Sequence, residues 1–134
     1  MKAREILTES LDRKTTYKIL LSFIEFAARD LELDSLPEFD FKFDTKTSIE
    51  HKSFGGYGGE HIRITVKNRH IMDVCRTLAH ELVHYSQDLK KELEDDGAGA
   101  TGSPQENEAN ARAAVIMRNW GKKHPEYFEK ESIE

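Results

Sequence analysis

A five-residue stretch constrains this chain more than any other: it reads HELVH and runs from His80 to His84. In an α-helix, residues four positions apart lie on the same face, so both imidazoles can bind one metal ion. The intervening Glu81 lies about 100° around the helix, close enough to take a proton from a metal-activated water. The alternative is a solvated helix that carries two histidines by chance.

The residues around this stretch have the pattern of an amphipathic helix, which we predict over roughly 70–92. Asn68 or a near neighbour would cap its N-terminus. At 100° per residue, His84 lies about 40° from His80, and both belong to a polar face. The apolar residues gather on the other side of the helix: Ile71, Val74, Cys75, Leu78, Leu82 and Leu89. Core histidines would be mixed among these residues, so the pattern favours a metal-binding pair.

Length and composition limit what kind of protein this is. The 134 residues suit one domain with its own core, for which we expect the bounds 14–134. A formal net charge of −5 argues against nucleic acid as a partner. The chain has no run of about 18 apolar residues, and its first residues lack the apolar stretch of a signal peptide. We therefore expect no membrane span and a location in the cytoplasm or in a virion.

The first residues are charged and lack apolar periodicity, so we expect a flexible N-terminal lead over 1–13. Leu7-Thr8-Glu9 fits the Leu-x-Glu sites that phage prohead proteases cut, and the opening is similar to leaders on phage virion proteins. An ordinary frayed terminus is the alternative. The indication of a phage origin depends on these residues alone.

The segments that precede the motif helix have regular apolar patterns. Helical spacing over 14–33 predicts a scaffold helix. Alternation predicts strands at 39–43 and 61–66, and we expect a further strand over 47–54. The glycine-rich stretch 54–59 does not have phosphate-binding spacing and is interpreted as a flexible hairpin connection, in preference to a ligand loop.

Small residues dominate the stretch 95–103, which predicts a loop. Ser103 followed by Pro104 is typical of a helix N-terminus. We predict a last helix from Pro104 to about Trp120, with Gly121 as its C-cap. The elements together indicate an α+β domain. The single cysteine, Cys75, cannot form an internal disulfide and is expected to be buried.

A catalytic zinc site needs three protein ligands, so the two histidines require a third. On the last helix, Glu106 shares a face with apolar residues, whereas Glu108 lies about 200° away on the outward side. A carboxylate on a core-facing stripe is costly unless it is paired or bound to metal, which favours Glu106. Ser103 and Glu106 also fit a capping box, in which the glutamate returns to the Ser103 backbone, and this alternative remains open.

Two further polar residues are candidates for orienting the imidazoles through a hydrogen bond to the ring nitrogen that does not bind the metal. Asn110 follows Glu106 by about one helical turn, and Asp73 lies on the same face of the motif helix as His80. Hydrogen bonds to a metal-binding imidazole fix its orientation, so we predict supporting roles for both residues.

These motifs resemble those of the gluzincin metallopeptidases. The stretch 77–84 reads TLAHELVH, and 106–114 reads ENEANARAA, a Glu-x-x-Ala-Asn-x-x-Ala-Ala pattern similar to that of the ImmA/IrrE-type peptidases and other minimal gluzincins. The resemblance covers roughly residues 60–120. It implies that Glu106 is the third zinc ligand. It also implies a small single-domain zincin with an N-terminal helix, a mostly antiparallel sheet of about three strands, the motif helix and a C-terminal helix that carries the third ligand.

In that family an extended peptide pairs with the strand before the motif helix, which here implies 60–66 or its glycine-rich neighbour. Many members carry a fused DNA-binding domain. We expect no such domain in these residues, so the resemblance does not imply cleavage of a repressor or regulator.

We therefore expect a zinc-dependent endopeptidase that acts on a protein or peptide substrate. One Zn²⁺ would activate a water molecule, and Glu81 would serve as general base. The residue that stabilises the oxyanion is undecided among Tyr57, His61, His124 and Tyr127. Two alternatives remain: a catalytically silent zincin-fold binding or virion structural module, and a helical interaction domain without metal.

Overall fold

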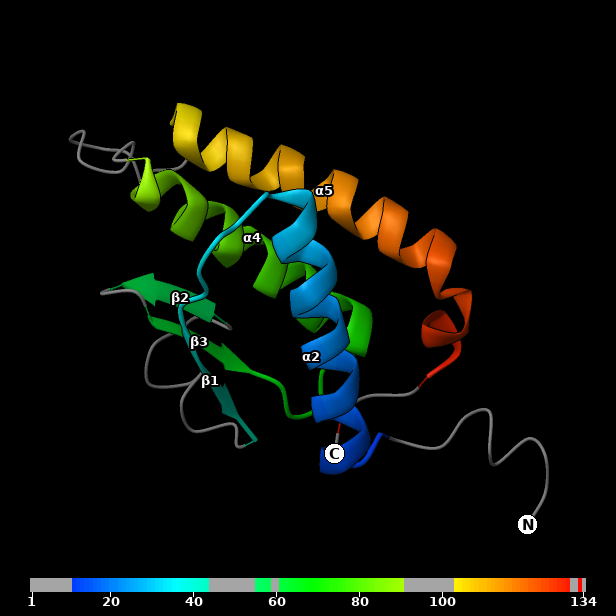
Figure 1. The fold of residues 1–134 in the computed structure, drawn as a ribbon. Helices are drawn as coiled ribbons and strands as arrows, with labels where there is room; N and C mark the ends of the chain where they lie inside the picture. The colour runs from blue at the N-terminus through cyan, green and yellow to red at the C-terminus, as the bar shows by residue number, and fades with distance from the viewer. Residues whose placement is uncertain (1–10, 44–54, 59–60, 91–102, 131–132, 134) are drawn as a thin grey trace, which may run out of the picture.

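The computed structural model describes residues 11–43, 55–58, 61–90, 103–130 and 133. Within these ranges the chain forms three α-helices, a short 3-10 helix and a three-stranded sheet (Figure 1). The helices are α2 (Arg13–Asp30), α4 (Ile71–Leu89), α5 (Pro104–Lys123) and η2 (Pro125–Glu129), and the strands are β1 (Glu38–Lys42), β2 (Gly55–Gly58) and β3 (His61–Thr65). The expected α+β class is confirmed. None of the helices described is both long enough and apolar enough to cross a membrane.

Helix α2 begins where Asp12 caps it, since the Asp12 side chain accepts a hydrogen bond of 2.7 Å from the Thr15 backbone amide. One face of α2 is buried in the core: Ile19, Leu20, Phe23, Ile24 and Ala27. The predicted lead over 1–13 is wrong at its C-terminal end. Leu11 is buried and forms a β-bridge with Ile133, and α2 begins at Arg13, so residues 11–13 belong to the folded domain; residues 1–10 lie outside the description.

The sheet has the order β1-β3-β2. Strand β3 pairs antiparallel with β2 and parallel with β1, so the expected mostly antiparallel sheet is wrong for one of the two pairings. The alternation of apolar residues reports which face of a strand is buried and carries no information on the direction of its neighbour.

The glycine-rich stretch also differs from the expectation of a hairpin connection. Its residues Gly55–Gly58 form the edge strand β2, with Tyr57 opposite Ile62. Glycine disfavours a strand because it has no side chain to pack, but the backbone hydrogen bonds of a ladder do not require one. The strand predicted over 47–54 and the loop predicted over 95–102 lie outside the described residues.

Helix α4 is the centre of the domain: it packs against α5 on one side and the sheet on the other, and α2 crosses it (Figure 1). It is capped by His70, whose Nδ1 accepts from the Met72 amide at 3.1 Å. Asn68 itself adopts a left-handed turn with φ 63°, a conformation that asparagine tolerates better than most residues. Most of the apolar face predicted for α4 is buried, since Ile71, Val74, Cys75, Leu78 and Leu82 are all fully inaccessible. The prediction is wrong for Leu89, which is 47% exposed in the last turn of the helix.

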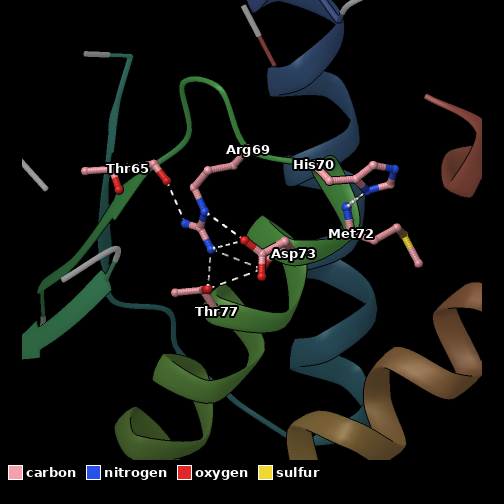
Figure 2. Close-up of polar contacts among 6 residues, drawn as sticks. All are labelled: Thr65, Arg69, His70, Met72, Asp73 and Thr77. Carbon is pink, nitrogen blue, oxygen red and sulfur yellow. Dashed lines mark hydrogen bonds and ion pairs between the residues drawn. The ribbon is translucent and has the colours of Figure 1, made fainter. Parts of the chain in front are cut away.

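A buried arginine joins the end of β3 to the first turns of α4 (Figure 2). The Arg69 guanidinium donates to the Thr65 carbonyl at 2.7 Å, to the Asp73 carboxylate at 2.9 Å and to the Thr77 hydroxyl at 2.6 Å. These hydrogen bonds fix the direction in which α4 leaves the sheet, and therefore the orientation of its polar face.

Helix α5 begins as predicted, with Pro104 in its first turn and the Ser103 hydroxyl accepting from the Glu106 amide at 3.1 Å. Its end differs from the prediction, because the helix continues to Lys123 and is capped by His124. Gly121 lies inside the last turn, where a Cβ atom would come within 3.1 Å of the Phe128 ring. This glycine therefore serves close packing in place of helix termination.

Candidate metal centre

The side chains of three residues on two helices converge at one point. Nε2 of His80 lies 2.9 Å from Oε1 of Glu106, and Nε2 of His84 lies 2.9 Å from Oε2 of the same carboxylate. The two Nε2 atoms are 3.2 Å apart. The imidazoles meet because they are four residues apart on α4, and Glu106 reaches them from the first turn of α5, which packs along α4 (Figure 1).

This group could hold a metal ion, since its ligand atoms all lie within 4.8 Å of one another. Two imidazole nitrogens and a carboxylate oxygen are the donors that zinc accepts at about 2.0–2.2 Å, which corresponds to ligand separations of about 3.4 Å in a tetrahedron. The observed separations of 2.9 and 3.2 Å are close to that value. Among the described residues the group offers three donors, one fewer than a tetrahedral site holds.

The site is mostly buried but still accessible to solvent, since the side chains of His80, His84 and Glu106 are 20%, 11% and 23% exposed. Burial lowers the pKa of the His80 imidazole, and the Glu106 carboxylate opposes this effect. A lowered pKa favours the neutral ring, which is the form that binds metal. His80 also has a hydrogen bond with Asn110, so Asn110 lies where the sequence predicted a supporting residue.

Glu81 is buried beside the three ligands, with 9% of the residue exposed. Burial raises the pKa of its carboxyl group to about 7; His84 lowers this pKa and Glu106 raises it further. A carboxyl group with a pKa near neutrality is suited to both accept and return a proton at physiological pH. Glu81 comes from the same turn as His80, so one short stretch of α4 supplies two candidate ligands and a candidate base.

Gln87 is a part of the site that the sequence interpretation did not single out. Its Oε1 lies 2.8 Å from Nδ1 of His84, and its Nε2 donates to the Gln105 carbonyl at 2.9 Å and to Oε1 of Glu108 at 2.8 Å. The available signal was its place three residues after His84, on the polar face of the helix.

The capping-box alternative for Glu106 is realised only in part. The Ser103 hydroxyl does cap the Glu106 amide, as that motif requires. The two carboxylate oxygens of Glu106, however, each lie 2.9 Å from an imidazole nitrogen. The same residue thus begins α5 through its backbone and contributes to the cluster through its side chain.

Two of the sequence candidates have their contacts elsewhere. Asp73 pairs with Arg69 at 2.9 Å, and seven helical residues, about 10 Å of rise, separate it from His80. His61 faces the acidic side chains of β1, at 3.6 Å from Glu38 and 4.0 Å from Asp40. The helical wheel placed Asp73 on the correct face but carried no information on this axial separation.

The C-terminal candidates lie at the opposite end of α5 from Glu106. His124 follows Glu106 by 18 residues, about 27 Å of helix, and its ring packs 4.2 Å from Trp120. Tyr127 stacks on His124 at 5.0 Å. Both therefore belong to an aromatic cluster away from the metal ligands. Tyr57 lies on β2, and the placement of its side chain is outside the described part of the chain.

No family model, curated protein or solved structure matches this chain. The function is therefore inferred from the residues of the site and their geometry.

Proposed function

We propose that this protein is a zinc-dependent metallopeptidase of the gluzincin type. His80, His84 and Glu106 would hold one Zn²⁺, and Glu81 would be the general base for peptide hydrolysis. The observation that supports the proposal is the convergence of two imidazoles of α4, each 2.9 Å from one carboxylate of α5, beside a buried glutamate.

The chemistry divides between the ion and the protein. When bound, zinc supplies Lewis acidity, which makes water more acidic and polarises a carbonyl group. The Glu81 carboxylate accepts the proton released by the attacking water and delivers it to the leaving amine. His80, His84 and Glu106 bind and orient the ion, and the packing of α4 on α5 keeps their donor atoms together.

The number of ligands favours catalysis over a purely structural site. Structural zinc sites are usually closed by four protein ligands, whereas catalytic sites use three and leave one position for water or substrate. The described residues supply three. A structural ion does not require a general base such as Glu81. Burying a carboxylate is also unfavourable, so the burial of Glu81 beside the proposed ligands favours a chemical role.

The test is a cleavage assay on denatured protein substrates with added zinc, in which mass spectrometry detects new peptide termini. Glu81→Gln keeps the shape of the side chain but cannot accept a proton. We expect it to retain zinc and to lose at least about 100-fold in rate. Tyr127→Phe is the matched control, because Tyr127 packs at the far end of α5, and it should cleave at the wild-type rate.

Two results would contradict the proposal. Equal cleavage by wild type and Glu81→Gln would remove Glu81 from the mechanism. Zinc binding with no cleavage of any substrate would instead support the catalytically silent zincin-fold module.

A further inference from the structure

Gln87 is almost fully buried, with 2% of the residue exposed, and its side-chain amide makes polar contacts with three residues. Its Nε2 lies 2.9 Å from the Gln105 carbonyl oxygen and 2.8 Å from a carboxylate oxygen of Glu108. The Gln105 carbonyl can only accept hydrogen bonds, and the same is true of the Glu108 carboxylate when it is ionised. The NH₂ group of Gln87 must therefore face them. The amide orientation is thereby determined, and the carbonyl Oε1 faces His84.

This orientation determines the proton on His84. Oε1 of Gln87 is an acceptor 2.8 Å from Nδ1 of His84, so Nδ1 must carry the hydrogen. The other ring nitrogen, Nε2, faces Glu106 and His80. When the neutral ring has its single hydrogen on Nδ1, the lone pair is on Nε2, and a bound cation would lie between Nε2 and the Glu106 carboxylate. That tautomer is the one in which His84 can donate electrons to a metal ion.

We infer that Gln87 is the positioning residue of this centre: it holds His84 in the Nδ1–H tautomer with Nε2 available to a divalent cation. The part that concerns metal affinity rests on the proposed function, whereas the tautomer can be measured without any metal. Gln87 acts through His84, since its hydrogen bonds reach His84, Gln105 and Glu108 and not His80 or Glu106.

The same side chain also couples the two ligand-bearing helices. Gln87 lies on α4, and both of its acceptors, Gln105 and Glu108, lie in the first two turns of α5, on either side of Glu106. One side-chain amide thus orients the His84 ring and also holds α5 in place along α4, next to Glu106. The helical angle of Glu108 assigned it to the outward face of α5, and its carboxylate takes part through the hydrogen bond that it accepts from Gln87.

The experiment uses the full chain freed of metal by a chelator, at about pH 8.5, roughly two units above the ordinary imidazole pKa. Two-dimensional ¹⁵N–¹H NMR of the ring nitrogens reports the tautomer of His84. We expect the wild type to be Nδ1–H. Gln87→Leu removes the acceptor at similar volume and should shift His84 towards Nε2–H, which can then donate to Glu106.

Two further variants separate this role from simple packing. Gln87→Glu loses the NH₂ group that donates to Gln105 and Glu108, and with it part of the link to α5, but both of its oxygens are acceptors, so it should retain the Nδ1–H tautomer. Gln105→Ala changes a side chain but keeps the backbone carbonyl that Gln87 uses, and it should behave as the wild type. If Gln87→Leu does not fold, the wild-type spectrum and Gln87→Glu still decide the question.

Zinc affinity, measured by competition with a chromophoric chelator, is the second readout. We expect Gln87→Leu to bind zinc about 10–100-fold more weakly than wild type or Gln105→Ala, the usual effect of losing a partner behind a ligand. An Nε2–H tautomer in the wild type, or an unchanged tautomer in Gln87→Leu, would overturn the inference. Failure of the proposed function would appear differently, as absent zinc binding or absent cleavage with the tautomer shift intact.

Discussion

Oε1 of Glu106 lies 2.9 Å from Nε2 of His80, although the two residues belong to different helices. The other oxygen of the same carboxylate lies 2.9 Å from His84, which is one turn further along α4. One side chain of α5 therefore spans both imidazoles of α4. A shared cation would bind all three donors at once, so metal binding and the packing of these two helices should be thermodynamically linked.

The first prediction is that zinc stabilises the folded protein. An ion that binds only the native state adds about 2.7 kcal/mol at 100 times its Kd, which is about 10 °C in Tm for a domain of this size. Differential scanning fluorimetry with zinc against chelator measures the shift. Glu106→Ala should abolish most of it, because it removes one of three ligands.

Glu126→Gln is the control for that experiment, since Glu126 is an acidic residue of η2 that pairs with His124 away from the cluster. Its zinc-dependent rise in Tm should equal that of the wild type. A rise of the same size in Glu106→Ala would show that zinc binds somewhere other than the proposed centre.

The second prediction concerns the buried Arg69. Arg69→Met fills similar space but removes hydrogen bonds to Thr65, Asp73 and Thr77 (Figure 2). We expect a loss of about 2–4 kcal/mol in the free energy of unfolding, because the Thr65 carbonyl loses a charged donor and β3 is no longer tied to α4. Urea unfolding of the metal-free protein measures it.

Arg69→Lys should recover little of this stability, because an ammonium group cannot reproduce the several directed contacts of a guanidinium. Asp73→Ala should cost only about 1 kcal/mol, since the Asp73 side chain is 56% exposed and its pairing is partly screened. If Arg69→Met and Asp73→Ala lowered the free energy of unfolding equally, the contact of Arg69 with Asp73 would account for the whole effect. The hydrogen bonds of Arg69 to Thr65 and Thr77 would then contribute nothing.

The third prediction is an acid dependence that comes from the cap of α2. The Thr15 backbone amide donates to the Asp12 carboxylate and holds the pKa of Asp12 below its usual value. A pKa lowered by folding contributes stability that is present above the unfolded pKa and is lost as the pH falls through the folded pKa. Wild-type Tm should therefore decline below about pH 4 in part because this carboxylate is protonated.

Asp12→Asn provides the matched control, because asparagine caps helices without titrating. Without metal, its Tm should fall less steeply than that of the wild type over the acid range. Parallel Tm curves for the two proteins would assign the acid sensitivity to other carboxylates.

Local patterns were sufficient for much of this protein. The four-residue spacing of His80 and His84 placed both on one face of α4 because helical geometry depends only on neighbouring residues. Glu106 was chosen over Glu108 for a similar reason, since its angle on α5 placed it among apolar side chains. The cap at Ser103 and the buried face of α2 also follow from short-range hydrogen bonding and periodicity.

Only the tertiary structure decided which strands pair in parallel and that Gly55–Gly58 extends the sheet. It also decided that Gln87 lies behind His84, with its amide held by residues of α5. The parallel pairing of β1 with β3 and the contacts of Gln87 with α5 join segments far apart in the chain. Periodicity describes the surface that an element buries, whereas the identity and direction of the element packed against it depend on how the whole chain fills its core.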